Sequence, residues 1–369
     1  MKTALVLGCS GLIGSHMVDR LKSEGYWVRG VDIKHPDYHV DKCDEFLIYD
    51  LRDPRNVEAV LRLDVDNTFS FQKRAFVDQK PFDEVYQFAA DMGGAGYIFT
   101  GEHDADIMTN SALINLNVAA WAKIYEVGKL FYSSSACVYS KEFQNRDSNA
   151  FYLSEWMAYP ANPDSEYGWE KLFSERLYLA YHNNYRMNVR IARFHNIYGE
   201  RTPYLDPKAK APAAICRKVA ESKQMTLSKS SPYFSVDIWG DGKQTRSFLY
   251  IDDCIDAVRL LMQSDFTGPV NIGSEEMISI NDLAKMVIGI SGKDIHIKNI
   301  PGPVGVRGRN SDNTLIREKL GWEPKYSLRE GMEKLYSWVN SQVNENTKGH
   351  STRYDHIDTA SSNYNPDHN

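Results

Sequence analysis

A tyrosine and a lysine stand four residues apart in the run Tyr167-Gly168-Trp169-Glu170-Lys171. On a helix this spacing places both side chains on one face, with about 5–6 Å between their Cβ atoms. A free phenol has a pKa near ~10 and is a poor base at neutral pH. A lysine ammonium beside it favours the phenolate, as would a positively charged nicotinamide ring. The pair is suited to taking a hydroxyl proton while a hydride leaves the same carbon for NAD. Any helix can carry this spacing by chance, so the surrounding motifs decide its meaning.

Two further candidates, Ser135 and Cys137, follow a predicted strand at 129–133. Side chains at the carboxyl end of a parallel strand are placed for work on a ligand. Ser135 can hydrogen-bond a sugar hydroxyl and the phenol of Tyr167. Cys137 has two interpretations: a small core residue, which is the usual role of a single cysteine, or a reactive group just past the strand end.

Basic residues are concentrated in the second half of a chain whose net charge is -6. Arginine presents its donors as a planar fork that matches phosphate oxygens in bidentate geometry. A nucleoside diphosphate would satisfy several of these side chains, whereas any single one could instead form a surface ion pair. The residues are Lys208, Lys210, Arg217, Lys218, Arg246, Arg307 and Arg309.

The elements that must position these residues begin at the N-terminus. Residues 3–7 predict a buried strand, the glycines of GCSGLIG follow, and residues 15–22 predict a helix. This is the context of a dinucleotide fingerprint, in which glycines let the backbone approach a pyrophosphate at the helix N-terminus. A second strand ends at Asp32, whose carboxylate can accept hydrogen bonds from a ribose 2′-hydroxyl and would repel a 2′-phosphate. The pattern therefore predicts NAD rather than NADP.

Two later strand ends have alternative interpretations. A third strand leads to Asp50, which with Leu51 flanks an adenine ring or else caps the helix that follows. A strand over 84–91 runs into MGGAGY, which contains Gly94. Its glycines indicate either a close approach of the backbone to a ligand or a flexible loop.

Alternating strands and helices over residues 1–199 predict the α/β class, with a Rossmann-type doubly wound parallel sheet that binds NAD. Residues at about 240–275 are expected to return to this domain. Residues 200–343 are expected to form mainly a smaller C-terminal α/β domain that binds a sugar nucleotide, closed by a helix around 328–341. The remaining segments are insertions at 62–80 and 222–236 and a polar, flexible tail at 344–369.

The composition limits the classes of protein that are possible. The chain has 369 residues, 42% hydrophobic and 25% charged, which suits one large domain or two joined ones. Its acidic net charge gives no reason to expect nucleic acid or an anionic membrane as a partner. No run approaches the ~20 apolar residues of a membrane span. Five scattered cysteines without a CxxC pair fit a reducing compartment and no metal cluster is evident, so a cytoplasmic protein is expected.

Together these motifs resemble the extended short-chain dehydrogenase/reductase superfamily of nucleotide-sugar enzymes. The resemblance rests on GxxGxxG with Asp32, SSSACVY, YGWEK and RFHNIYG. Longer blocks, spread over most of residues 3–335, resemble the branch of this superfamily that epimerises GDP-mannose at C3 and C5. They are QFAADMGGAGYI, KAPAAICRK, WGDGKQTRSFLYIDDC, PVNIGSEEMISINDLA and IPGPVGVRGRNSDN. The chain departs from that branch in the two insertions and at 200–208.

The resemblance implies an NAD-dependent isomerase that works through a transient 4-keto sugar. Tyr167 takes the C4 hydroxyl proton, Lys171 holds the phenolate and the nicotinamide ribose, and Ser135 bonds the C4 oxygen. Cys137 and Lys210 then move protons on opposite faces of the sugar. A homodimer built on the helix that carries YGWEK and on its neighbour is also implied. Cofactor contacts are implied for Gly8, Gly11, Leu12, Ile13, Gly14, Asp32, Asp50, Leu51, Tyr167 and Lys171, and substrate contacts for Gly94, Ser135, Ala136, Cys137, Asn196, Lys210, Lys218, Gln244, Arg246 and Arg309.

Three rival functions remain at this point. A 4,6-dehydratase is disfavoured, because that class is expected to carry an Asp-Glu pair where this chain has Ala136-Cys137. A 4-epimerase, or a related enzyme acting on another GDP-, UDP- or dTDP-sugar, would not need Cys137 and Lys210. A catalytically silent NAD-binding regulator is the alternative outside enzymes, but it would have no need of Ser135, Tyr167 and Lys171 together.

Overall fold

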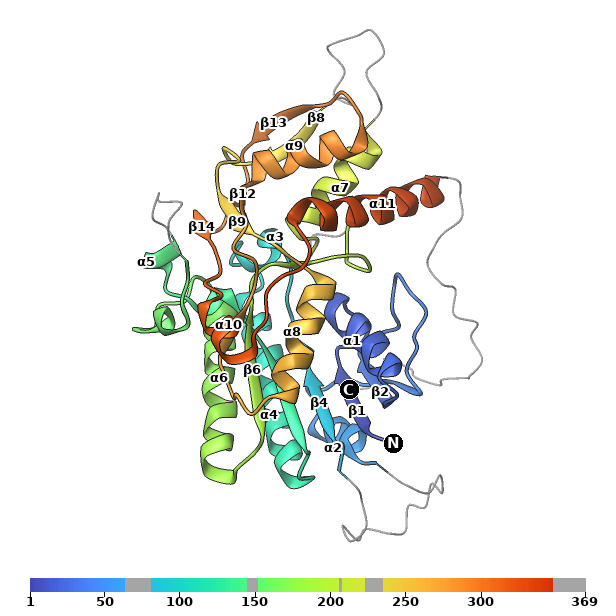
Figure 1. Cartoon of the computed structure of the whole chain (residues 1–369), viewed down its shortest axis with the longest axis vertical. Coiled ribbons are helices and arrows are strands. Elements are labelled where there is room, and N and C mark those ends of the chain that lie inside the picture. The colour runs from blue at the N-terminus through green and yellow to red at the C-terminus, as the bar shows by residue number, and fades with distance from the viewer. Residues whose placement is uncertain (64–80, 145–151, 206–207, 223–234, 348–369) are drawn as a thin grey trace, which may run out of the picture.

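The computed structural model describes residues 1–63, 81–144, 152–205, 208–222 and 235–347 (Figure 1). The predicted first strand is β1 (Thr3–Leu7), and all five of its residues are buried. Strands of a parallel sheet that is covered on both faces read as continuous apolar runs rather than as alternating ones. The TALVL run forms an interior strand of such a sheet, paired with β2 on one side and β4 on the other. Within the described residues, no helix is long and apolar enough to cross a membrane.

Seven parallel strands form the main sheet, in the order β11-β6-β5-β4-β1-β2-β3. From β1 the chain moves outward to β2 and β3, then crosses to the other side of β1 for β4. This reversal is the topological switch point of a doubly wound fold, where the carboxyl ends of the strands leave a crevice. Strand bounds are β2 (Trp27–Asp32), β3 (Glu45–Ile48), β4 (Glu84–Gln87), β5 (Lys129–Ser135), β6 (Val189–Phe194) and β11 (Val270–Ile272).

Helices cover both faces of the sheet. Ala4 and Val6 of β1 pack with side chains of α1 (Leu12–Ser23) and α8 (Ile251–Gln263). Leu5 and Leu7 point the other way, toward side chains of α2 (Pro54–Leu61), α4 (Asp104–Ile124) and α6 (Glu166–Tyr185). Successive side chains of a strand point to opposite faces, so one strand contributes to two helical layers. The predicted fold class is confirmed.

A smaller α/β part lies beyond the carboxyl ends of the strands (Figure 1). It contains a two-stranded parallel sheet of β8 (Ser235–Trp239) and β13 (His296–Ile300), packed by α7 (Ala211–Glu221) and α9 (Ile280–Ser291). The helix α11 (Leu328–Thr347) packs on α7 and α9. Three short strands, β9 (Thr245–Ser247), β12 (Met277–Ser279) and β14 (Gly308–Arg309), form another sheet.

The remaining elements are short. They are α3 (Ala95–Ile98), a single helical turn η1 (Ala136–Val138), α5 (Lys141–Gln144), a second turn η2 (Glu155–Ala158), β7 (Ile197–Tyr198), β10 (Leu249–Tyr250) and α10 (Thr314–Leu320).

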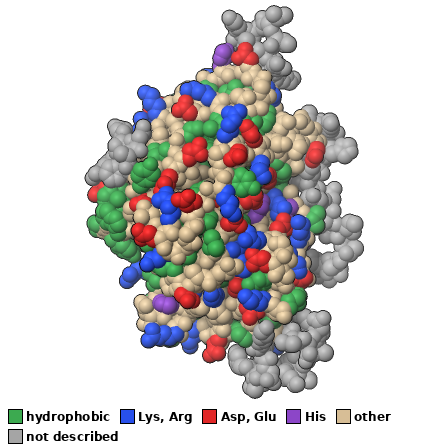
Figure 2. Space-filling view, viewed as in Figure 1, with side chains coloured by type: hydrophobic (Ala, Val, Ile, Leu, Met, Phe, Trp, Pro, Cys, Tyr) green, Lys and Arg blue, Asp and Glu red, His purple; other side chains and the backbone are tan. Residues whose placement is uncertain are grey.

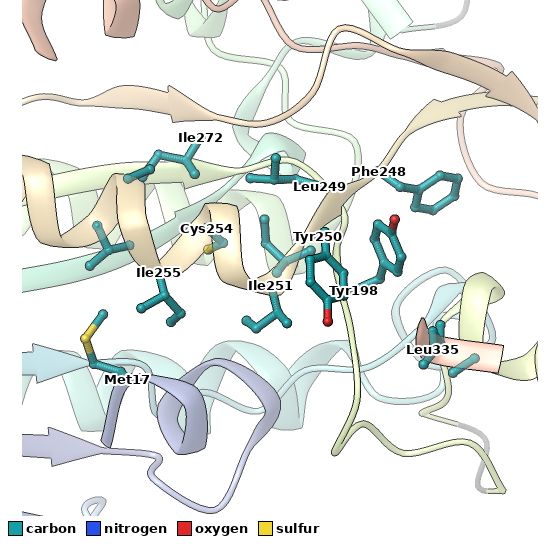
Figure 3. Close-up of a cluster of buried hydrophobic side chains, with 14 of the residues drawn as sticks. Met17, Tyr198, Phe248, Leu249, Tyr250, Ile251, Cys254, Ile255, Ile272 and Leu335 are labelled. Atoms are coloured by element: carbon teal, nitrogen blue, oxygen red, sulfur yellow. The ribbon is translucent and has the colours of Figure 1, made fainter. Parts of the chain in front are cut away.

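One hydrophobic cluster joins the two parts. Met17 of α1, Cys254 of α8, Tyr198 of β7 and Leu335 of α11 belong to it, and Figure 3 shows these side chains around the start of α8. Because protein interiors are close-packed, this shared core holds the smaller part in place against the sheet. The residues on either side of a crevice between the two parts are therefore held in place by the same hydrophobic cluster.

One predicted boundary needs correction. The last helix continues to Thr347, so residues 344–347, predicted to belong to the polar tail, are part of α11. The rest of the predicted tail lies outside the described residues. Of the predicted insertions at 62–80 and 222–236, residues 64–80 and 223–234 also lie outside the described residues. The proposed division of the chain at residue 199 stays a prediction.

Acidic and basic side chains are interspersed over the face in Figure 2.

Candidate active site

A cavity of about 1140 Å³ lies at the switch point, between the carboxyl ends of the strands and the smaller part. Sites for single drug-sized ligands usually measure ~300–1,000 Å³, so this one has room for a dinucleotide and a second ligand together. Its lining includes the glycine loop after β1, the ends of β2 and β5, the start of α6, and residues of α7, β8 and β9.

Nearly all the residues predicted to contact cofactor or substrate line this cavity. Ala136 is the exception, because its methyl group is 1% exposed and packs with Val138, Tyr139 and Leu172. The residues that do line it are Gly8, Gly11, Leu12, Ile13, Gly14, Asp32, Asp50, Leu51, Gly94, Ser135, Cys137, Tyr167, Lys171, Asn196, Lys210, Lys218, Gln244, Arg246 and Arg309.

The glycine loop fits a dinucleotide. Gly8 has a φ of 82°, which favours glycine. A Cβ on Gly14 would lie 2.1 Å from the carbonyl oxygen of Gly8, so α1 packs against the loop more closely than a side chain allows. Gly11 precedes the first helical residue, and a Cβ there would meet only the Gly8 oxygen, at 3.5 Å. The loop therefore leaves the backbone N–H groups at the N-terminus of α1 open to an anion.

Asp32 stands at the end of β2, where a ribose of NAD would lie. Its carboxylate accepts hydrogen bonds from the backbone N–H of Ser10, at 3.0 Å, and of Ile33, at 2.8 Å. Burial raises the pKa of Asp32, and these hydrogen bonds act against that rise. Two N–H donors hold the carboxylate at the cavity wall and leave it lone pairs for ribose hydroxyls.

The alternative role of Asp50 as a helix cap is wrong. The cap of α2 is Asp53, whose carboxylate accepts from the backbone N–H of Arg55, and Pro54 takes the first helical position. Asp50 instead pairs with Arg52 at the edge of the cavity. The signal for the true cap was present in the sequence, since Asp followed by Pro is a common helix start.

The YGWEK run begins α6, as predicted. Ser165 caps this helix by accepting a hydrogen bond from the backbone N–H of Gly168. Lys171 is 2% exposed, donates to the carbonyl oxygen of Ser133 at 2.9 Å, and lies 5.6 Å from the ring centre of Tyr167. Burial raises the pKa of the Tyr167 phenol, and Ser135 is among the groups that lower it. Burial lowers the pKa of Lys171. A bound cation near the ring would favour the phenolate further.

Cys137 faces the cavity from η1, directly after β5. Its side chain packs with Tyr167, and its sulfur lies 3.2 Å from Nη1 of Arg309. Burial raises the pKa of the Cys137 thiol, and Arg309 lowers it. A thiol that lines a cavity and accepts from a guanidinium differs from a core residue, which would have apolar neighbours only.

The structure separates the basic residues into two groups. Arg217 pairs with Glu221 at 2.7 Å, Arg307 with Asp241 at 3.3 Å, and Lys208 with Asp91 at 3.0 Å. For these three the ion-pair interpretation is confirmed.

Arg246 differs from these paired residues. In the described part of the chain, its guanidinium donates only to the carbonyl oxygens of Thr245 and Val304, and no carboxylate pairs with it. Burial lowers the pKa of Arg246 to about 9, with Arg309 beside it acting in the same direction. An anion in the cavity would relieve this unpaired cation.

The remaining predicted residues line the second half of the cavity. Lys210 precedes the first residue of α7, and burial lowers its pKa while the charge of Cys137 raises it. Lys218 donates to the carbonyl oxygen of Asp237 at 2.5 Å, and Asn196 donates to that of Ser247 at 2.8 Å. The buried amide oxygen of Gln244 accepts no hydrogen bond from any described residue, so it can accept one from a ligand.

Gly94 is placed by a backbone hydrogen bond to Lys208 at 2.9 Å. A Cβ there would lie 2.4 Å from the carbonyl oxygen of Ala209. The close approach predicted for this glycine is therefore real, but the partner in the structure is the chain itself, at 208–209.

Sequence reasoning missed two residues beside Cys137. Gln144, at the end of α5, and Asp164, before the cap of α6, both accept hydrogen bonds from Arg309. They belong to a stretch without clear periodicity. The one available signal was that Asp164 immediately precedes the capping serine of the YGWEK helix.

Comparison with known proteins identifies the class to which this fold and cavity belong. Residues 4–273 match the NAD dependent epimerase/dehydratase family, and the chain belongs to that family. More narrowly, it is 41% identical to the GDP-mannose 3,5-epimerase of Arabidopsis thaliana over 347 residues, which are 93% of this chain and 84% of that protein. The chain is therefore an NAD-dependent epimerase of nucleotide sugars, and not a regulator that only binds NAD.

Solved structures agree with this class. The UDP-glucose 4-epimerase of Thermotoga maritima, with UDP-glucose, gives a TM-score of 0.76 at 25% identity and covers 92% of this chain and 99% of that one. The UDP-glucuronic acid 4-epimerase of Bacillus cereus, with UDP-glucuronic acid and NAD, gives 0.73 at 25% identity, with the same coverage.

Proposed function

We propose that the enzyme epimerises GDP-mannose at C3 and C5 through a transient 4-keto sugar. The observation that carries the proposal is that Cys137 and Lys210 line one cavity with Tyr167. They are close enough for the charge of Cys137 to affect the pKa of Lys210. A 4-epimerase has no need of this second acid–base pair. The relationship to GDP-mannose 3,5-epimerases supports the same substrate.

The first half of the reaction activates the sugar. A ring C–H is not acidic enough for a side chain to remove, but a ketone at C4 acidifies both C3 and C5. NAD, held by the glycine loop and Asp32, would supply a reversible acceptor for the C4 hydride. Tyr167 takes the C4 hydroxyl proton, Ser135 holds that oxygen by a hydrogen bond, and Lys171 stabilises the phenolate. Lys171 is fixed for this role by the carbonyl oxygen of Ser133.

The second half exchanges protons at C3 and C5. One group removes a proton from one face of the ring and another delivers a proton to the opposite face. Cys137 stands on η1 and Lys210 just before α7, so two separate elements bring them to the one cavity. Burial lowers the pKa of Lys210 toward the working pH, as proton transfer requires. Arg246 is the side chain that pairs with the diphosphate of the substrate.

The test is incubation with GDP-mannose and NAD in D₂O, with products read by NMR and mass spectrometry. We expect deuterium at C3 and C5, and its loss in Cys137→Ala and Lys210→Ala. Turnover of another GDP-, UDP- or dTDP-sugar without deuterium on carbon would instead identify a 4-epimerase. In that case the two alanine variants should retain most of the activity.

We also propose a homodimer formed by α4 and α6. These helices pack on each other, yet their outer sides expose large apolar residues: Leu113 at 40%, Leu116 at 41%, Trp169 at 39% and Phe173 at 47%. Such a surface is typical of an interface. Phe173→Glu should convert the dimer to a monomer in light scattering after size exclusion. A wild-type chain that elutes as a monomer would contradict the proposal.

The five free cysteines, four of them buried, support a cytoplasmic location. Fractionation of cells that make the enzyme tests this.

A further inference from the structure

Arg309 is held on all three of its side-chain nitrogens. Its Nε donates to Oε1 of Gln144 at 2.7 Å, its Nη1 to the sulfur of Cys137 at 3.2 Å, and its Nη2 to a carboxylate oxygen of Asp164. The Arg309 and Asp164 side chains are 7% and 1% exposed, and Gln144 is fully buried. A guanidinium has five N–H donors, and these three contacts use one on each nitrogen, including one of the two on each Nη that a diphosphate would share. Arg309 therefore has fewer donors left for the substrate diphosphate than an unengaged guanidinium would have.

Asp164 itself connects two parts of the site. Its backbone N–H donates to the carbonyl oxygen of Cys137 at 3.4 Å, and one carboxylate oxygen accepts from the hydroxyl of Ser165 at 2.7 Å. Ser165 caps the helix of Tyr167 and Lys171. The other carboxylate oxygen binds Arg309. One carboxylate thus touches the start of the Tyr167 helix and the guanidinium that contacts the Cys137 sulfur.

We propose that Asp164 and Gln144 are positioning residues that hold the Arg309 guanidinium against the Cys137 sulfur. Arg309 then stabilises the thiolate of the proton-transferring Cys137. Of the two arginines, Arg246 alone binds the diphosphate. The two arginines occupy neighbouring positions on paired strands, β9 and β14. Arg309 has a carboxylate partner and contacts the thiol, whereas Arg246, among the residues that the structure describes, donates only to carbonyl oxygens. Adjacent cations with such different surroundings have different roles.

The sign of each charge near Cys137 makes this assignment testable. Arg309 lowers the pKa of the thiol, and the charge of Asp164 raises it directly. If Asp164 were only a neighbouring charge, its removal would lower the thiol pKa. If it positions Arg309, its removal raises the pKa, because the guanidinium leaves the sulfur. The other ionisable groups that interact with the thiol are Tyr167, Lys171, Lys210 and Arg246.

The experiment is alkylation of Cys137 by iodoacetamide over a range of pH, followed by peptide mass spectrometry, which distinguishes it from the other four cysteines. We expect the apparent pKa to rise by about one unit in Arg309→Gln and in Asp164→Ala. In the Arg309→Gln background, Asp164→Ala should lower it instead. A fall in both backgrounds would overturn the proposal. Gln144→Leu changes no charge and should also raise the pKa, which keeps the test decisive if Asp164→Ala does not fold.

A second readout is the affinity for GDP, measured by calorimetry with NAD present. Arg246→Gln should weaken GDP binding more than tenfold, and Arg309→Gln less than threefold. Equal losses in the two variants would place Arg309 on the diphosphate and overturn the assignment. Asp256→Asn, which breaks ion pairs remote from the cavity, is the control and should change neither readout. The inference rests on the proposed role of Cys137, but the thiol titration uses no sugar, so failure of GDP-mannose turnover and failure of this inference are distinguishable.

Discussion

Replacing Gly14 by alanine should damage both the fold and the cofactor site. The new Cβ would lie 2.1 Å from the Gly8 carbonyl oxygen and 2.8 Å from Cys9 Cα, and both are backbone atoms that cannot swing away. Ordinary contact begins at 3.4 Å, so α1 or the loop must move by about 1.3 Å. Overpacking of this kind costs ~1–3 kcal/mol of stability.

The same displacement moves the N–H groups of α1 away from the pyrophosphate. Hydrogen bonds to a charged group contribute ~1.5–3 kcal/mol each, and 1.4 kcal/mol is about tenfold in affinity. We therefore expect Gly14→Ala to weaken NAD binding by about 10- to 100-fold and to lower the melting temperature by several degrees. Calorimetry and thermal denaturation without NAD measure the two effects separately.

Gly11→Ala is the matched control within the same loop. Its φ of -77° suits any residue, and its Cβ would make one ordinary contact, at 3.5 Å. It should melt like the wild type, while the methyl group on the cavity wall weakens NAD binding. If Gly14→Ala melts and binds NAD like the wild type, the close packing of loop and helix does not hold this site together.

Other perturbations test the supports of the site. Glu175, on α6, accepts two hydrogen bonds of 2.8 Å from Arg193, on β6, and both residues are 1% exposed. Glu175→Gln should lower the free energy of unfolding by about 3 kcal/mol in urea, because it leaves a buried charge unpaired; a change below 1 kcal/mol would contradict this. Burial lowers the pKa of His195 to about 3, so the unfolded state binds an extra proton between pH 6.5 and 3 and stability falls as pH falls through that window. Between neutral pH and pH 5.5, the free energy of unfolding of His195→Gln should therefore fall by about 1.4 kcal/mol less than that of the wild type. Parallel profiles of unfolding free energy against pH would rule this out. Asp32→Asn should weaken NAD binding about tenfold and narrow its preference over NADP, whereas unchanged affinities for both would remove Asp32 from the ribose site.

Local signals predicted most elements of the NAD-binding half. The apolar run of β1 and the helical spacing of Tyr167 and Lys171 are properties of neighbouring residues, and the structure shows both elements. The end of α11 was missed, because no glycine or proline near residue 341 stops the helix.

The sequence by itself determined the chemistry available to this enzyme: a tyrosine and lysine on one helical face, a carboxylate at the end of β2, and a thiol after β5. Only the tertiary structure decided which acidic side chain or thiol lies beside each arginine. Arg309 meets Cys137 and Asp164 across 172 and 145 residues of chain, whereas Arg307, two residues earlier, pairs with Asp241. A guanidinium has the same charge at every position, so its role depends on the partner that folding brings to within hydrogen-bonding distance and on the water that folding removes.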